Sequence, residues 1–299
     1  MHQWDAELVV DARCLVGEGP SWDAAAGRLL WVDIQGKALH TYDPVSGSAT
    51  RVALPSEPGT IVPRTGGGAV IAAEDGFALV DPFTGALEPL INPEADHPER
   101  RFNDGKCDPQ GRLWAGTLCQ DLDRPPDQWD PVGTLYRLDG DGACYAMLYD
   151  LIIPNGLTWS PDGSVFYFID SPGNVVQAFD FEPRRGELSK RRVVVEIPAE
   201  VGFPDGMTSD EEGMLWIAHF FGGKVTRWNP ATGEMIGLIQ LPVGNVTSCV
   251  FGGADLADLY ITTASLLLDE AGRQAQPEAG GVFVARPGVR GVPSHPFNG

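Results

Sequence analysis

The chain of 299 residues is 43% hydrophobic and 21% charged, which indicates a globular protein with a large core and leaves little room for long disordered segments. Its formal net charge of −20, with no basic patch to offset it, argues against nucleic acid or an anionic membrane surface as a partner. The N-terminus has no signal-like apolar run, no segment is apolar enough to span a membrane, and the five scattered cysteines form no metal or disulfide pattern, so we expect a cytoplasmic protein with reduced thiols.

The strongest pattern along the chain is a short strand-like run that recurs after a polar turn. From the N-terminus, these runs occupy residues 27–33, 111–116, 163–170, 213–218 and 258–262. The turns that precede most of them lie at residues 22–27, 108–111, 160–163 and 209–213. Proline presets one backbone torsion and glycine accepts a positive φ, so these turns predict hairpins between antiparallel strands. A third strand follows most of the runs, often with a second turn and an outer strand.

The repeated unit is therefore a meander of four strands and roughly 40 to 50 residues, and about six units fit into the chain. We predict an all-β fold in which residues 1–299 form a single domain, a six-bladed β-propeller with four antiparallel strands per blade. Residues 8–14 are expected to supply the N-terminal strand that closes the last blade and removes the open sheet edges. The second unit, residues 58–91, matches the pattern poorly at residues 59–62, so a seven-bladed ring stays open as an alternative.

A second repeat lies at the start of the predicted inner strands, where a carboxylate or carboxamide stands beside a glycine. The occurrences are Glu18-Gly, Asn103-Asp-Gly, Asn155-Gly and Asp205-Gly. One such pair alone is typical of a turn, but four in register predict side chains that converge in a funnel on the axis of the ring. Together Glu18, Asn155 and Asp205 form an all-oxygen set, which suits Ca²⁺, Mg²⁺ or Mn²⁺ and holds Zn²⁺ less characteristically.

These motifs, with others in the same order, carry a family resemblance. The segments are Glu18-Gly-Pro, Asn155-Gly-Leu and residues 101–106, 115–117, 167–171, 204–207, 248–253 and 276–281. From about residue 8 to the C-terminus, the chain resembles the regucalcin/gluconolactonase family, also called senescence marker protein. The resemblance implies a six-bladed propeller that holds one divalent cation and hydrolyses sugar lactones. It assigns Glu18, Asn155 and Asp205 as ligands of that cation, for which we expect Ca²⁺ before Zn²⁺, Mn²⁺ or Mg²⁺.

The same resemblance indicates residues that bind the substrate. Arg101 and Asn103 match family residues that engage it, with Asn103 close to the cation, and Asp121 stands where family members often carry glutamate. Arg101 either hydrogen-bonds the polyol or pairs with a nearby carboxylate. Trp129 lies in a loop, residues 118–132, that departs from the family pattern, and it either caps a sugar face or pins its own loop.

Hydrolysis of a sugar lactone needs a polarised carbonyl, a water nucleophile and stabilisation of the tetrahedral oxyanion, and a cation with open positions serves these needs. We assign Asp205 as the base that takes the proton of the water, with a metal hydroxide as the alternative. The predicted function is a metal-dependent hydrolase that opens aldonolactones such as gluconolactone to aldonic acids in carbohydrate metabolism, as a monomer whose partner is a small molecule. A calcium-binding regulatory protein and a promiscuous phosphotriesterase are the alternatives.

Overall fold

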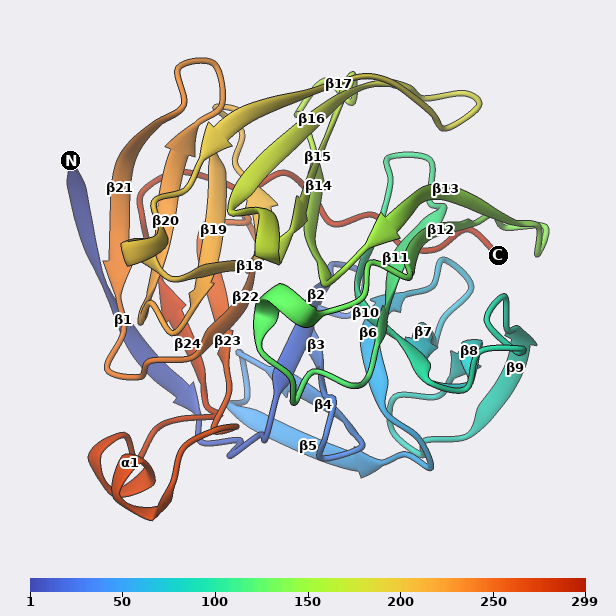
Figure 1. The fold of residues 1–299 in the computed structure, drawn as a ribbon. Helices are drawn as coiled ribbons and strands as arrows, with labels where there is room; N and C mark the ends of the chain where they lie inside the picture. Colours follow the sequence, from blue (N-terminus) through green and yellow to red (C-terminus); the bar gives the residue numbers. More distant parts are fainter.

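The computed structural model describes all residues from Met1 to Gly299 and confirms an all-β chain (Figure 1). The first four-stranded sheet contains β2 (Gly17–Asp23), β3 (Arg28–Asp33), β4 (Ala38–Asp43) and β5 (Ser48–Ala53), and the second contains β6 (Pro58–Pro63), β7 (Ala69–Ala73), β8 (Gly76–Val80) and β9 (Leu87–Ile91). The third contains β10 (Arg100–Cys107), β11 (Leu113–Cys119), β12 (Gly133–Leu138) and β13 (Cys144–Leu151). The fourth contains β14 (Pro154–Trp159), β15 (Val165–Asp170), β16 (Val175–Glu182) and β17 (Glu187–Glu196). An eight-stranded sheet in the order β18-β19-β20-β21-β1-β24-β23-β22 holds the rest: β18 (Phe203–Ser209), β19 (Leu215–Phe220), β20 (Lys224–Asn229), β21 (Glu234–Gln240), β1 (His2–Val10), β24 (Val282–Ala285), β23 (Asp258–Thr263) and β22 (Val246–Gly252).

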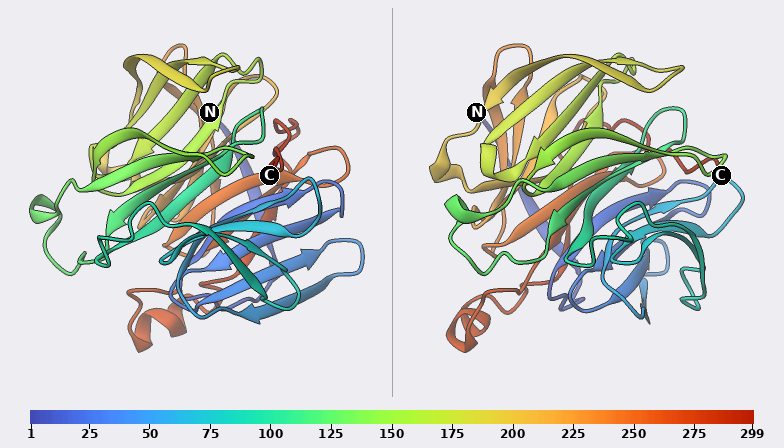
Figure 2. Two further views of the ribbon diagram at one scale, coloured as in Figure 1. Left: turned by 90° about the vertical axis from the view of Figure 1, so that its right-hand side faces the viewer. Right: turned by 45° about the vertical axis from the view of Figure 1, so that its right-hand side comes forward.

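The first strand of each group lies at the centre of the molecule. Strands β2, β6, β10, β14, β18 and β22 contact one another in that order, and β22 contacts β2 again. Figure 1 shows these strands in the middle, and Figure 2 shows the sheets from two other directions. Apolar side chains fill the space between neighbouring sheets, as where Leu30 of β3 and Ile61 of β6 share one core cluster. This closed arrangement of four-stranded units is consistent with a β-propeller.

The predicted turns form where the sequence analysis placed them. Gly111, Gly163 and Gly213 have φ values of 77°, 68° and 78°, the left-handed conformation that glycine adopts without strain. In the first of these turns, Asp108 also accepts the indole N–H of Trp114 at 3.0 Å. The turn is thereby tied to a fully buried side chain of the next strand.

The closing strand differs from the prediction in its position. It was expected over residues 8–14, whereas β1 ends at Val10. Residues 6–10 pair antiparallel with β24, as expected of an outer strand, but residues 2–5 pair parallel with β21. One strand therefore serves two neighbours and joins the last two groups of four into a single sheet. Trp4 packs on Trp216, with ring centroids 5.2 Å apart, and anchors the parallel half.

The second unit, which matched the repeat poorly, is a regular four-stranded sheet. Its inner strand β6 contains Gly59 without the carboxylate or carboxamide that accompanies the glycine in the other motifs. A Cβ on Gly59 would overlap the backbone oxygen of Asn103 in the neighbouring β10. Close packing between the two inner strands explains why this segment departs from the sequence pattern.

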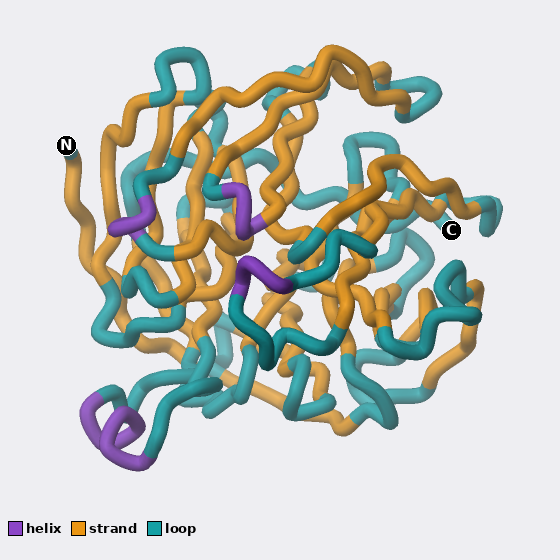
Figure 3. The backbone as a smooth tube through the Cα atoms, in the orientation of Figure 1, coloured by secondary structure: helices purple, strands orange, loops and turns teal.

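Helix is scarce in the molecule, as Figure 3 shows. The helical segments are α1 (Glu270–Ala275) and the 3-10 turns η1 (Pro126–Gln128), η2 (Ser171–Gly173) and η3 (Ala199–Val201). None of these helices is long and apolar enough to cross a membrane. All five cysteines are free thiols, in agreement with the expectation from their spacing.

Candidate functional site

The four side chains singled out in the sequence lie at irregular points of the inner strands. The pairing register between the first and second strand shifts just after Glu18 and across Asn103, Asn155 and Asp205. Such bulges turn a side chain out of the regular alternation of a strand. All four residues are buried, with exposed fractions of 5% to 8%. The bulges therefore aim these polar groups at the centre of the ring.

Glycine follows three of these residues because the next inner strand is too close for a side chain. A Cβ at Gly156 would lie 2.6 Å from the backbone oxygen of Asp205, and one at Gly206 would overlap the side chain of Ser248. Neighbouring inner strands thus meet backbone to backbone, and functional side chains from different sheets are held at short range.

A chain of hydrogen bonds fixes the two amides of the site. Asn103 Nδ2 donates to Asn155 Oδ1 at 3.1 Å and to the oxygen of Pro154 at 3.0 Å. Asn155 Nδ2 donates to Ser171 Oγ at 2.9 Å, and this hydroxyl donates to the oxygen of Pro204 at 2.7 Å. The amide nitrogen of Asn155 is engaged by Ser171, whereas its Oδ1 accepts from Asn103 with one lone pair and keeps the second for a ligand at the centre.

Three carboxyl groups share this buried centre, those of Glu18, Asp104 and Asp205. Burial, together with the charge of Asp104, raises the pKa of Glu18 to about 8. Burial and the charges of Glu18 and Asp104 raise the pKa of Asp205 well above its usual range, and the interaction between the Asp205 and Glu18 side chains acts in the same direction on Asp205. The pKa of Asp104 is also raised by burial, while the Lys106 ammonium opposes this shift.

These groups fit a divalent cation. Glu18 and Asp104 each accept one hydrogen bond from the backbone N–H of the following residue, at 2.7 Å, so most of their oxygen lone pairs are left for another partner. Buried carboxylates that repel one another are costly unless a positive charge compensates them. Carboxylate and amide oxygens are the ligands that Ca²⁺ and Mg²⁺ prefer.

Arg101 borders the cluster and has a carboxylate partner of its own. Its Nη1 donates to Asn103 Oδ1 at 3.1 Å and to the oxygen of Phe102 at 2.9 Å, while its Nε lies 3.3 Å from Glu57 Oε2. Burial lowers the pKa of Arg101, and the charge of Glu57 opposes this shift. Pairing with a carboxylate, one of the two alternatives from the sequence, is therefore present.

Comparison with known proteins places this chain in a family. Residues 16–265 match the family model described as the SMP-30/Gluconolactonase/LRE-like region. The chain belongs to this family. It is 40% identical over 300 residues to regucalcin of Danio rerio, which covers 100% of both chains. It is 38% identical over 295 residues to the putative sugar lactone lactonase YvrE of Bacillus subtilis, which covers 99% of both.

A solved structure also matches this member of the SMP-30/gluconolactonase family over nearly its whole length. It is described as a calcium-binding protein, regucalcin, from Agrobacterium tumefaciens, and it matches with a TM-score of 0.90 at 29% identity over 99% of each chain. The resemblance noted from the motifs is thus confirmed at the level of the family.

Asp121 and Trp129, which the sequence analysis associated with the substrate, make contacts within their own loop. The Asp121 side chain is 61% exposed and its carboxylate lies 3.2 Å from Arg124 Nε. Trp129 Nε1 donates to the backbone oxygens of Arg124 at 2.8 Å and Leu122 at 3.3 Å. These contacts favour the interpretation in which Trp129 pins its own loop.

Three residues of the site were not singled out from the sequence. Asp104 occupies the position where the other motifs carry glycine, and the sequence indicated a role only for its neighbour Asn103. Ser171 contacts Asn155 within the same unit, from the segment after β15, and Glu57 contacts Arg101 from the neighbouring unit. Only Asp104 left a signal in the sequence, a second acidic residue inside a repeated motif.

A second group of metal-capable side chains lies elsewhere, between β1 and β4. The ligand atoms of Cys14, Asp33 and His40 are within 4.8 Å of one another, and all three residues are buried. The Asp33 carboxylate, however, accepts three backbone N–H groups, from residues 15, 16 and 36. Burial raises the pKa of Cys14 to about 12 and lowers that of His40 to about 4, so both are neutral near pH 7. The position of Asp33 is therefore explained by its hydrogen bonds to the backbone N–H groups of these loops.

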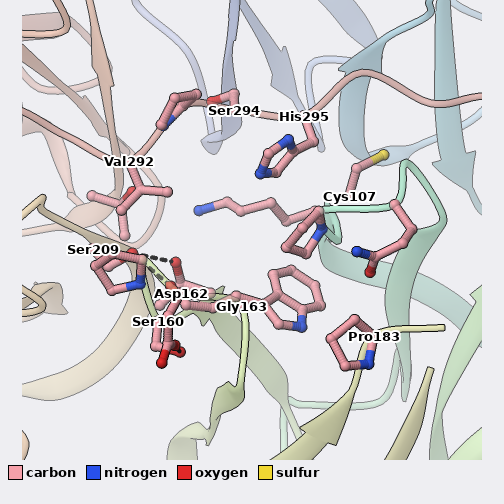
Figure 4. A pocket seen from close by; sticks show the side chains of 17 residues that line it. Cys107, Ser160, Asp162, Gly163, Pro183, Ser209, Val292, Ser294 and His295 are labelled. Atoms are coloured by element: carbon pink, nitrogen blue, oxygen red, sulfur yellow. Dashed lines mark hydrogen bonds between the residues drawn. The ribbon is translucent and has the colours of Figure 1, made fainter. Parts of the chain in front are cut away.

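A separate cavity lies at the opposite ends of the inner strands (Figure 4). This cavity of about 210 Å³ is bordered by the turns after β10 and β14 and by the C-terminal segment, with Ser160, Ser209 and His295 among its lining. Glu18, Asn155 and Asp205 do not line it. The carboxylate cluster and this cavity are therefore separate sites.

Proposed function

We propose that the protein is a divalent-metal-dependent lactonase that opens sugar lactones such as gluconolactone to aldonic acids, built on a six-bladed propeller. The observation that carries the proposal is the buried set of oxygen ligands from three inner strands, Glu18, Asn155 and Asp205. Relatives named as a sugar lactone lactonase and as regucalcin support a lactonase-type activity for a chain with this site.

The proposed cation is held by Glu18 and Asp205 through carboxylate oxygens and by Asn155 through Oδ1. When bound, it polarises the lactone carbonyl and lowers the pKa of a water molecule. Ca²⁺ is the favoured ion, because the set contains only hard oxygen ligands. The calcium-binding description of the Agrobacterium structure supports the same choice.

Asp205 is the proposed general base. A base works best when its pKa lies near the working pH, and burial together with Glu18 and Asp104 moves the pKa of Asp205 upward. The same environment offsets the loss of basicity that a carboxylate suffers beside a cation. Asp205 would take the proton of the attacking water and hold it on a carboxylate oxygen.

Arg101 and Asn103 are proposed to bind the hydroxyl groups of the substrate. Arg101 has further N–H groups beyond those that contact Glu57 and Asn103, and a guanidinium held on two sides presents them in a fixed direction. Asp121 is proposed as a further polyol contact, which requires that its carboxylate leave Arg124. Its exposed position makes that exchange inexpensive.

A calcium-binding role without catalysis is the second candidate, because one described relative is named for calcium binding alone. The two candidates share the ligands and differ in turnover. One experiment separates them when metal binding and hydrolysis are measured on the same protein.

The test begins with protein stripped by a chelator and reloaded separately with Ca²⁺, Mg²⁺, Mn²⁺ or Zn²⁺. A pH-indicator assay against glucono-, galactono-, xylono- and arabinono-lactones should show turnover restored by at least one ion. Asp205→Asn should lose about 10²-fold or more in kcat, while Asp43→Asn, in an exposed turn, should match the wild type. Tight Ca²⁺ binding without hydrolysis of any lactone would instead establish the binding protein.

A further inference from the structure

Two positions before the central residue of each inner strand stands a further residue, and we call these six residues the outer layer. Arg101 and Phe203 lie near the start of β10 and β18, two residues before Asn103 and Asp205, whereas Val246 is buried in the core between the sheets. In chain order from β2 to β22 the layer contains Val16, Glu57, Arg101, Ile153, Phe203 and Val246. Charged groups occur only on two adjacent units, those of β6 and β10.

The layer therefore has a polar side and an apolar side. On the polar side, Glu57 and Arg101 pair at 3.3 Å. The apolar side includes Ile153, just before β14, and Phe203, the first residue of β18, both partly exposed. Phe203 stands two residues before Asp205, so the proposed base is bordered by an aromatic ring.

A second aromatic residue extends the apolar side outward. Strand β19 runs antiparallel to β18, and Phe220 at its end pairs with Phe203. The next residue, Phe221, contacts both rings edge-on, with centroids 4.7 Å from Phe220 and 6.4 Å from Phe203. Its side chain lies at the surface, and the residue is 59% exposed.

The backbone of Phe221 indicates a role beyond packing. Its φ of 62° lies in the left-handed region, which is unfavourable for a bulky residue by about 1 kcal/mol or more. The two residues that follow are glycines, which adopt this conformation freely. Strained backbone conformations of this kind cluster at active sites and ligand clamps.

We propose that Phe203 and Phe221 form an apolar subsite, and that the substrate is a lactone with hydroxyl groups on one edge and an apolar edge or substituent on the other. This inference rests on the proposed lactonase function and names the substrate class. The hydroxylated edge faces Arg101 and Glu57, and the apolar edge covers the two phenylalanines. Phe221 then determines specificity, because its ring loses solvent-exposed surface only when an apolar group covers it.

The test uses Phe221→Asn, because asparagine tolerates a positive φ and the variant should fold at least as well as the wild type. The matched control is Phe83→Asn, which removes another exposed phenylalanine (53%) in the turn between β8 and β9. For an alkyl-substituted δ-lactone such as δ-nonalactone, kcat/KM should fall about tenfold in Phe221→Asn. For gluconolactone it should change less than about twofold, and Phe83→Asn should change neither.

Binding of lactams gives a readout that does not depend on turnover. Calorimetry with gluconolactam and with the δ-lactam analogue of nonalactone should show the same selective loss for the alkyl ligand in Phe221→Asn. Equal losses for both ligands, or none, would overturn the apolar subsite. If the wild type hydrolyses no lactone, the proposed function fails, and the lactam affinities still decide whether the subsite exists.

Discussion

Asp104 adds a third carboxyl group to a site that needs only two charges to hold a divalent cation. It stands in β10 at the position where the neighbouring motifs carry glycine, and its charge is among the causes that raise the pKa of both Glu18 and Asp205. The affinity of oxygen sites for Ca²⁺ rises with the number of charged ligands nearby. Asp104, although outside the proposed ligand set, is therefore expected to raise the affinity of the site for Ca²⁺.

Asp104→Asn is expected to weaken Ca²⁺ binding about tenfold or more, because one negative charge leaves a poorly screened site. Calorimetric titration of chelator-treated protein measures the change. Asp43→Asn, an equal charge change in an exposed turn, should bind as the wild type does. Unchanged affinity in Asp104→Asn would show that Lys106 already neutralises this carboxylate.

The raised pKa values also predict how stability without the cation depends on pH. The pKa of Glu18 is about 8 in the fold, against an ordinary value of 4.5, so the folded state binds more protons than the unfolded state between these values. The stabilising contribution is complete below about pH 4.5 and is lost as the pH rises through 8. The pKa of Asp205 is shifted in the same direction.

In chelator, the melting temperature should therefore fall between pH 5 and pH 8, and the fall should be smaller in Glu18→Gln. Saturating Ca²⁺ should remove most of the difference between the two proteins' slopes, because it binds the deprotonated carboxylates. Thermal melts at a series of pH values test this. An identical slope for wild type and Glu18→Gln would contradict the buried, proton-binding state of the carboxyl.

At the level of the strands, bulges and glycines position the site. Gly206 has no room for a side chain because β22 lies against it, and the same closeness sets Asp205 beside its neighbours. Gly206→Ala should lower the free energy of unfolding by about 2 kcal/mol, as the strands must move apart. Gly173→Ala is the control, since its Cβ would meet only Val175 at 3.7 Å. Urea denaturation of both variants should separate them clearly; equal stabilities would mean that the inner strands shift freely.

The strands and turns could be predicted from the sequence because their signals are local. The turn glycines, such as Gly111, and the apolar character of the following runs report on a few neighbouring residues only. The parallel pairing of β1 with β21 and the contact of Glu57 with Arg101 join different units of the fold, and no local pattern records them. For the site, the motifs indicated Glu18, Asn155 and Asp205. The ion pairs of Arg101 with Glu57 and of Asp121 with Arg124 became visible only in the structure.

At the scale of the whole molecule, two terminal segments tie the ring together. β1 connects the last two units through its pairing with β21 and β24. The C-terminal segment crosses the opposite end of the inner strands, where the N–H of Val292 donates to Ser209 and that of Phe297 donates to Pro63. β1 thereby joins the fifth and sixth units, and the C-terminal segment contacts the second and fifth units. The C-terminal segment also borders the cavity in Figure 4.

Phe297 is the anchor of the C-terminal segment. It is 2% exposed and belongs to the core cluster between the second and third sheets that also contains Val62 and Phe102. Phe297→Ala should lower the free energy of unfolding by about 3 to 5 kcal/mol, because it leaves a cavity and releases the C-terminal segment from the core. The ligands of the proposed cation lie at the other ends of the strands, so Ca²⁺ affinity well below the melting temperature should stay unchanged. Phe83→Ala, which truncates an exposed ring, serves as the control for stability. If Phe297→Ala weakens Ca²⁺ binding as strongly as it weakens the fold, the C-terminal segment also sets the geometry of the ring at the metal site, and closure of the ring and binding of the cation depend on the same contacts.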